Sequence, residues 1–147
     1  SSWKWFFTLV LPLLFVYISN QWSRSSLYYL VNFSDDATPF SAMNVDIGFS
    51  QSEYGLLASL GFTALFAIAS LGAGAAADRF DRKLLTVVAA LGWGVATFGT
   101  ASSSSYPEVL GWRIIMGLAC AFTTPTAYTL INDRVAKEQK SFATSLY

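Results

Sequence analysis

The chain has 147 residues, of which 54% are hydrophobic and 12% charged, and its nine basic and nine acidic residues give zero net charge. The charged share is about half that of soluble domains, which indicates a membrane protein, and the balanced charge gives no reason to expect a nucleic-acid partner. The absence of histidine, a single cysteine and the lack of metal-ligand or phosphate-loop spacing predict no enzyme, no cofactor and no bound metal.

Four apolar runs approach the length needed to cross a hydrocarbon core of about 30 Å as helices. We place them at residues 5–31, 54–77, 84–101 and 108–131. They are linked by a long loop at 32–53, the charged string DRFDRK at Asp78–Lys83, and the turn sequence SSSSYP. The sequence therefore predicts an all-α membrane protein with four transmembrane helices in a lipid bilayer.

The charges outside these helices are divided by side. Seven basic residues fall on one face of the predicted membrane, namely Lys4, Arg79, Arg82, Lys83, Arg134, Lys137 and Lys140. The opposite face has no basic residue but carries Asp35, Asp36, Asp46, Glu53 and Glu108. Because positive loops stay on the cytoplasmic side, or the equivalent stromal or matrix side, we expect both termini there.

Arg24 and Arg113 are the only basic residues inside the predicted helices. Helix geometry places each roughly 8–10 Å below the outer surface. Each belongs to a polar stripe at helical spacing, one with Tyr17, Asn20, Gln21 and Tyr28, the other with Gly117, Cys120, Thr124 and Tyr128. An arginine at this depth indicates a functional site or a buried pair, or else a side chain that snorkels to the nearby interface. Two facing stripes would line a wet cavity.

Two motifs resemble a known family. The string GAGAAADRFDRK, between the second and third runs, has the form Gly-x-x-x-Asp-Arg-x-x-Arg-Lys. The fourth run, RIIMGLACAFTTPTAYTLIND, has Arg-x-x-x-Gly with a proline beyond it, and the tail AKEQKSFATSLY resembles a link into a fifth helix. Together they resemble the N-terminal portion of the major facilitator superfamily, nearest in look to its spinster-like and anion:cation symporter branches. Asp81 departs from the pattern, which usually has glycine there.

The resemblance implies an inverted three-helix repeat followed by the first helix of the next, so residues 1–147 form a partial N-terminal transporter bundle. It also implies secondary active or facilitative transport of a small, anionic organic solute by alternating access. In the anion-transporting branches, matching arginines on helices one and four bind the carboxylate or phosphate of the substrate. The candidate substrate-binding residues are therefore Arg24, Arg113, Asn20, Gln21, Tyr28, Thr124 and Tyr128.

The resemblance also gives the charged string a possible function as an inner latch. It implies that Asp78 caps a helix of the other half, while Arg82 pairs with the acid at the inner end of helix four, here Asp133. Arg79 and Lys83 complete the candidate latch. The alternative interpretation is that the string is a positive-inside anchor only.

The chain departs from the resembled family in two ways, which concern proton coupling and the number of helices. The resembled branches often place glutamate where this chain has Cys120, and an acid where it has Ser23, so proton coupling through these helices is doubtful. Alternating access requires two six-helix halves. Either a second half belongs to the transporter, or the chain is a truncated or degenerate relative that acts as a structural subunit of a larger membrane complex.

Overall fold

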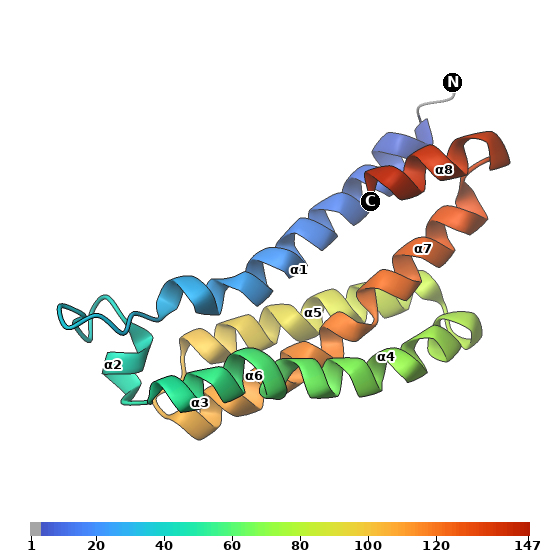
Figure 1. The fold of residues 1–147 in the computed structure, drawn as a ribbon. Helices are drawn as coiled ribbons and strands as arrows, with labels where there is room; N and C mark the ends of the chain where they lie inside the picture. Colours follow the sequence, from blue (N-terminus) through green and yellow to red (C-terminus); the bar gives the residue numbers. More distant parts are fainter. Residues whose placement is uncertain (1–3) are drawn as a thin grey trace.

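The computed structural model of the chain describes residues 4–147, and these fold into helices only, with no strand among them (Figure 1). The order is a π-helical turn η1 (Phe6–Val10), α1 (Leu11–Leu30), α2 (Met43–Ile47), α3 (Gln51–Gly55), a second π-helical turn η2 (Leu56–Leu60), α4 (Gly61–Arg79), α5 (Arg82–Ala101), α6 (Tyr106–Ala121), α7 (Thr123–Arg134) and α8 (Lys137–Leu146).

Four helical stretches are long and apolar enough to cross a membrane, which confirms the predicted fold class. They span Phe6–Leu30, Gln51–Arg79, Arg82–Ala101 and Tyr106–Arg134. The second and fourth stretches extend two or three residues beyond the apolar runs at each end, because a helix continues through polar residues that an apolar run does not include. The start of η1, α8 and the α4–α5 hairpin lie toward the same end of the molecule in Figure 1.

Side-chain caps fix where the second and third membrane helices begin. At the start of α3, the backbone N–H of Ser50 donates to Glu53 Oε2 at 2.7 Å, and the backbone N–H of Glu53 donates to Ser50 Oγ at 3.3 Å. At the start of α5, the backbone N–H of Leu84 donates to Asp81 Oδ1 at 2.8 Å. Asp81, the residue that departs from the resembled motif, is therefore the N-cap of the third membrane helix.

Three apolar clusters join the helices at successive levels. One cluster joins α1, η2 and α6 through Leu27, Leu57 and Val109, with Phe49 from the loop before α3. A second joins α4, α5 and α6 through Phe62, Ala89, Trp93, Ala96, Met116 and Cys120. A third joins η1 and α1 to α7 and the segment after it, through Val10, Leu13, Ala127, Ile131, Val135 and Ala143. The first helix thus contacts α6 at one end and α7 at the other.

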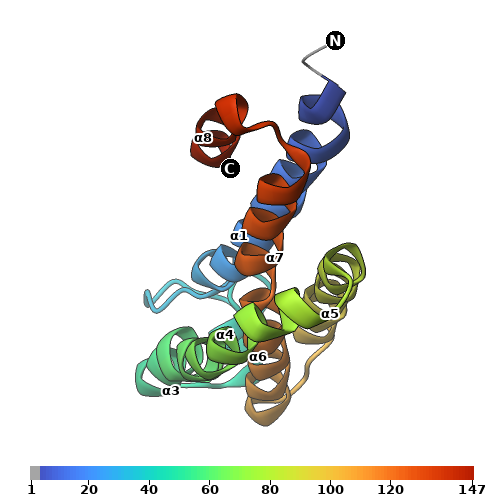
Figure 2. The same ribbon diagram turned by 90° about the vertical axis from the view of Figure 1, so that its right-hand side faces the viewer.

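The fourth membrane stretch bends at Phe122, between α6 and α7. Pro125 has no N–H for the helical ladder, and its ring crowds the carbonyl of Ala121 four residues earlier. The next carbonyl, that of Phe122, accepts from the backbone N–H of Thr126 at 3.4 Å and from its hydroxyl at 2.6 Å. After the bend, α7 packs against η1 and α1 through Ala127 and Ile131, and its end stays joined to α5 by the Arg82–Asp133 salt bridge; Figure 2 shows the change of direction between α6 and α7.

A glycine sets the separation of α4 and α6. A Cβ added to Gly117 would lie 2.8 Å from the backbone oxygen of Phe62, closer than any real Cβ contact. Such small residues allow helix backbones to approach each other within a bilayer. Gly111, on the same helix, has nothing within 4 Å of an added Cβ.

Replacing Gly117 with alanine should therefore destabilise the protein, because the added methyl group pushes α4 away from α6. We expect a loss of about 1–3 kcal/mol, the usual cost of overpacking a core. The measurement is thermal unfolding of the purified protein in detergent. Gly111→Ala is the matched control and should leave stability equal or slightly raised; equal stability of the two variants would contradict the close packing.

Candidate functional site

The first helix contributes one polar wall of a pocket. Gln21, Arg24, Ser25 and Tyr28 all line it, and their spacing of three, four and seven residues places them on one face of α1. Arg24 lies six residues before the end of this helix at Leu30, which corresponds to about 9 Å along the helix axis. The wall is thus within the first membrane stretch and near its end at Leu30.

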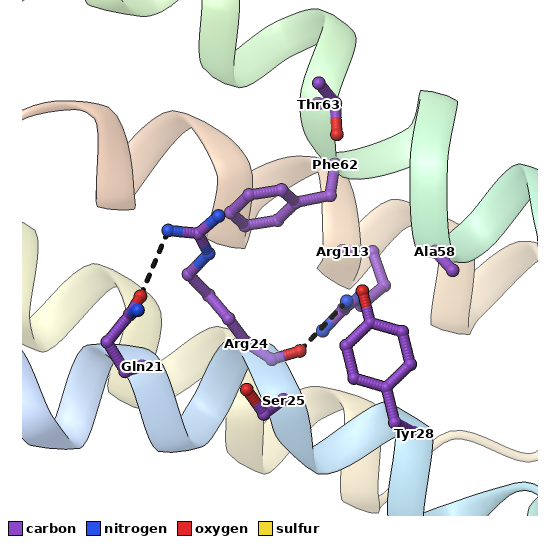
Figure 3. A pocket seen from close by; sticks show the side chains of 8 residues that line it. All are labelled: Gln21, Arg24, Ser25, Tyr28, Ala58, Phe62, Thr63 and Arg113. Carbon is purple, nitrogen blue, oxygen red and sulfur yellow. Dashed lines mark hydrogen bonds between the residues drawn. The ribbon is translucent and has the colours of Figure 1, made fainter.

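The opposite wall comes from the second and fourth membrane stretches. It consists of Ala58 from η2, Phe62 and Thr63 from α4, and Arg113 from α6 (Figure 3). The pocket has a volume of about 250 Å³. An engineered cavity of about 150 Å³ holds benzene, so this pocket has room for a solute with a single ring.

Arg113 is buried with weak partners. Its side chain is only 2% exposed. Its Nη2 donates to the backbone oxygen of Arg24 at 3.4 Å, and its Nη1 to Met116 Sδ at 3.5 Å. Within residues 4–147 its Nε has no hydrogen-bond partner. A buried cation without a carboxylate partner is costly. An anion that bound this guanidinium group would remove part of that cost, because it would supply the missing acceptor.

Arg24 lies beside Arg113 and is held by neutral groups. Its Nη1 donates to Gln21 Oε1 at 3.1 Å. Its guanidinium carbon lies 4.8 Å from the centre of the Phe62 ring and 5.5 Å from that of Phe66. Both distances are within the range of cation–π attraction.

The pocket combines two positive charges with no negative one. None of its eight lining residues is acidic, and both guanidinium groups are held by neutral acceptors or aromatic rings. Two like charges in a medium of low dielectric constant repel each other, and an anion between them relieves that repulsion. Guanidinium groups also match the paired oxygens of a carboxylate. The chemistry of the pocket therefore suits a small organic anion.

Asn20 lies outside this pocket. Its Nδ2 donates to Cys120 Sγ at 2.8 Å, and both side chains are buried. The pair joins α1 to α6, about one helical turn from Arg24 and about two turns from Arg113. Thiol sulfur is a weak acceptor, so the contact positions two helices and leaves the pocket without a carboxylate at this level.

Thr124 and Tyr128 also lie away from the arginines. Both follow the bend at Phe122 and are exposed on α7. The ring of Tyr128 contacts the ring of Tyr147 at 5.5 Å between centroids. Of the seven predicted binding residues, the structure brings together Gln21, Arg24, Tyr28 and Arg113.

The candidate latch residues gather at the other end of the molecule. Arg82 forms a salt bridge with Asp133, and its Nε donates to the backbone oxygen of Ala77 at 3.0 Å. Asp78 and Lys83 line the same hollow, whereas Arg79 is exposed at the end of α4. Within residues 4–147 the carboxylate of Asp78 forms no salt bridge. The Arg82–Asp133 pair therefore joins α5 to α7, and the carboxylate of Asp78 has no basic partner among the described residues.

Four lining residues were not identified from the sequence, namely Ser25, Ala58, Phe62 and Thr63. Phe62 is the most informative of them, because it contacts both arginines. The sequence does contain a signal for it, since Phe62 and Phe66 are one turn apart in a run that is otherwise rich in small residues. Within residues 4–147 no group of His, Cys, Asp or Glu could hold a metal ion.

Comparison with known proteins identifies a family and several relatives. The family model described as Major Facilitator Superfamily matches residues 13–147. The 4-hydroxybenzoate transporter PcaK of Pseudomonas aeruginosa is 28% identical over 134 residues, which cover 86% of this chain and 30% of that protein. The niacin transporter NiaP of Acinetobacter baylyi is 30% identical over 90 residues, covering 61% of this chain and 20% of that protein.

A gallate transporter of Pseudomonas putida is 29% identical over 96 residues, covering 65% of this chain and 21% of that protein. The chain thus spans less than a third of the length of these relatives. No solved structure gives a significant match to the chain.

Proposed function

Because the chain belongs to the Major Facilitator Superfamily, we propose that it forms part of a membrane transporter for a small organic anion that binds between Arg24 and Arg113. The observation that carries this proposal is the pair of guanidinium groups in one pocket that has no acidic lining residue. Tyr28 and Gln21, on the same wall, supply polar groups that could orient the rest of the solute.

The substrates named for the relatives support this chemistry. 4-Hydroxybenzoate, niacin and gallate each carry one carboxylate on a single aromatic ring. A pocket of about 250 Å³ with two arginines is compatible with solutes of that size and charge. We infer that the solute carried here is also a small carboxylate, moved by alternating access between the two sides of the membrane.

The same pocket bears on how transport is driven. A proton-coupled mechanism needs a titratable acid that exchanges its proton as the solute binds. Two turns from Arg113 the fourth span has Cys120, which accepts a hydrogen bond from Asn20, and the residue before Arg24 on the first span is Ser23. We propose facilitated or exchange transport through these helices.

Replacing either Arg24 or Arg113 with glutamine should abolish uptake of radiolabelled 4-hydroxybenzoate by cells that express the transporter. Each substitution removes a charge that the solute needs, while glutamine keeps a shorter, polar and uncharged side chain. Lysine should restore uptake poorly, because an ammonium group lacks the paired donors of guanidinium.

The matched control is Lys137→Gln, which removes an exposed positive charge far along the chain and should leave uptake unchanged. Surface expression is measured for every variant by biotinylation. Normal uptake by both arginine variants would contradict the proposed binding site.

We propose that both termini and the α4–α5 hairpin face the cytoplasm or its topological equivalent. All seven basic residues outside the pocket lie on that side of the four crossings. The loop between the first and second membrane stretches would then face outward, and Phe40 in that loop is fully exposed.

A cysteine at position 40 should therefore react with a membrane-impermeant maleimide added to intact cells, whereas a cysteine at position 137 should react only after permeabilisation. Both positions are exposed. Native Cys120 is first replaced by serine, which preserves an acceptor for Asn20. The reverse pattern of labelling would overturn the topology.

We also propose that the inner cluster is a gate. The Arg82–Asp133 pair braces the ends of α5 and α7, and the carboxylate of Asp78 is free to cap a helix N-terminus of a second bundle. Such a contact favours the state in which the inner side is closed. A difference of about 1.4 kcal/mol changes a two-state ratio tenfold, so one contact is sufficient to shift the populations.

Asp78→Asn should leave the protein folded but bias it toward the inward-open state and slow turnover. The readout is the labelling rate, from the inner side, of a cysteine placed at the exposed position Thr124, which should rise. Glu138→Gln, a loss of an exposed acid on α8, is the control. An unchanged labelling rate in the full transporter would leave the cluster as a topological anchor only.

A further inference from the structure

One aromatic ring contacts both arginines of the pocket. The guanidinium carbon of Arg24 lies 4.8 Å from the centre of the Phe62 ring, and that of Arg113 lies 5.6 Å from the same centre. Both values lie inside the limit of about 6 Å for a cation–π interaction. Figure 3 shows the ring projecting from α4 toward both side chains.

Because the ring carries no net charge, it leaves the positive charge of the pocket unchanged. A carboxylate in its place would pair with the arginines and compete with an incoming anion. An aliphatic side chain would offer no negative potential to two neighbouring positive charges. The π face attracts a guanidinium group while contributing no net charge, so the pocket remains positive and able to bind an anion.

The position of the ring is fixed by its surroundings. Phe62 is 5% exposed and belongs to the cluster that joins α4, α5 and α6. It stacks on Phe66, with 5.6 Å between centroids and 17° between planes. Its own backbone oxygen lies against Gly117, one turn along α6 from Arg113. The ring therefore cannot move away from the arginines without separating these helices.

We propose that Phe62 is a positioning residue of the anion site, which holds the guanidinium groups of Arg24 and Arg113 side by side through its π electrons. The inference rests on the proposed function, because it assigns a role within the same pocket. It adds a residue that binds no part of the solute but sets the geometry and the free charge of the groups that do.

The simplest alternative is that Phe62 only fills space in the core. The two roles respond differently to ring fluorination, which withdraws electron density from the π face while changing the shape of the ring very little. A packing role depends on shape, and a cation–π role depends on electron density. The decisive experiment is therefore a series of fluorinated phenylalanines at position 62 in the full transporter.

With one, two and three ring fluorines, the KM for 4-hydroxybenzoate should rise stepwise, reaching about 3- to 30-fold at three. The maximal uptake rate per surface molecule should stay constant, because the ring affects binding and not the conformational change. Phe62→Leu should show the full rise in KM. The amount at the surface is measured for each.

The matched control is the same fluorinated series at Phe122, which packs against the same apolar cluster but, within residues 4–147, lies against no guanidinium group. That series should leave KM unchanged. A flat KM across the series at position 62, or a fall in surface amount alone, would overturn the proposal. If Arg24→Gln and Arg113→Gln also transported normally, the anion site itself would be wrong, whereas loss of uptake in those two with a flat fluorine series would reject Phe62 alone.

Discussion

The burial of Arg113 among three helices is the constraint on which the arginine end of this bundle depends. A guanidinium group that is buried needs partners, and residues 4–147 supply a backbone oxygen, a thioether sulfur and an aromatic ring. Each is neutral and weak, so the positive charge is held in place without being cancelled. Two close contacts hold the helices around this side chain. The α4 helix approaches α6 at Gly117, and α1 contacts α6 through the Asn20–Cys120 pair.

The charged side chains are treated differently at the two ends of the bundle. At the end with Arg24 and Arg113, the guanidinium groups have no acidic partner and the pocket is bounded by aromatic, hydroxyl and amide side chains. At the end with the α4–α5 hairpin, opposite charges are paired across α5 and α7, where both side chains are partly exposed and the pair costs little to form. One chain thus uses arginine in two ways, as a buried cation without an acidic partner in the pocket and as half of a partly exposed salt bridge between α5 and α7.

Much of this was predictable from the sequence, and the exceptions have physical causes. The four membrane helices follow from apolar runs, and the meeting of Arg24 and Arg113 was expected from equal depths on antiparallel helices. Thr124 and Tyr128 were grouped with Arg113 by assuming a straight helix, which Pro125 does not allow. Phe62 was missed because an aromatic residue in an apolar run has the same pattern whether it packs against carbon or against a cation. The capping by Asp81 was missed because it depends on a backbone N–H three residues away.

The bend at Phe122 has a mechanical consequence for the whole bundle. The segment before it is fixed to α4 and α5 by the central apolar cluster, and the segment after it is fixed to α1 by a different one. Between them Pro125 donates no backbone hydrogen bond, so the helical ladder is interrupted there. A change in the angle between α6 and α7 would therefore strain fewer backbone hydrogen bonds than the same bend in an unbroken helix.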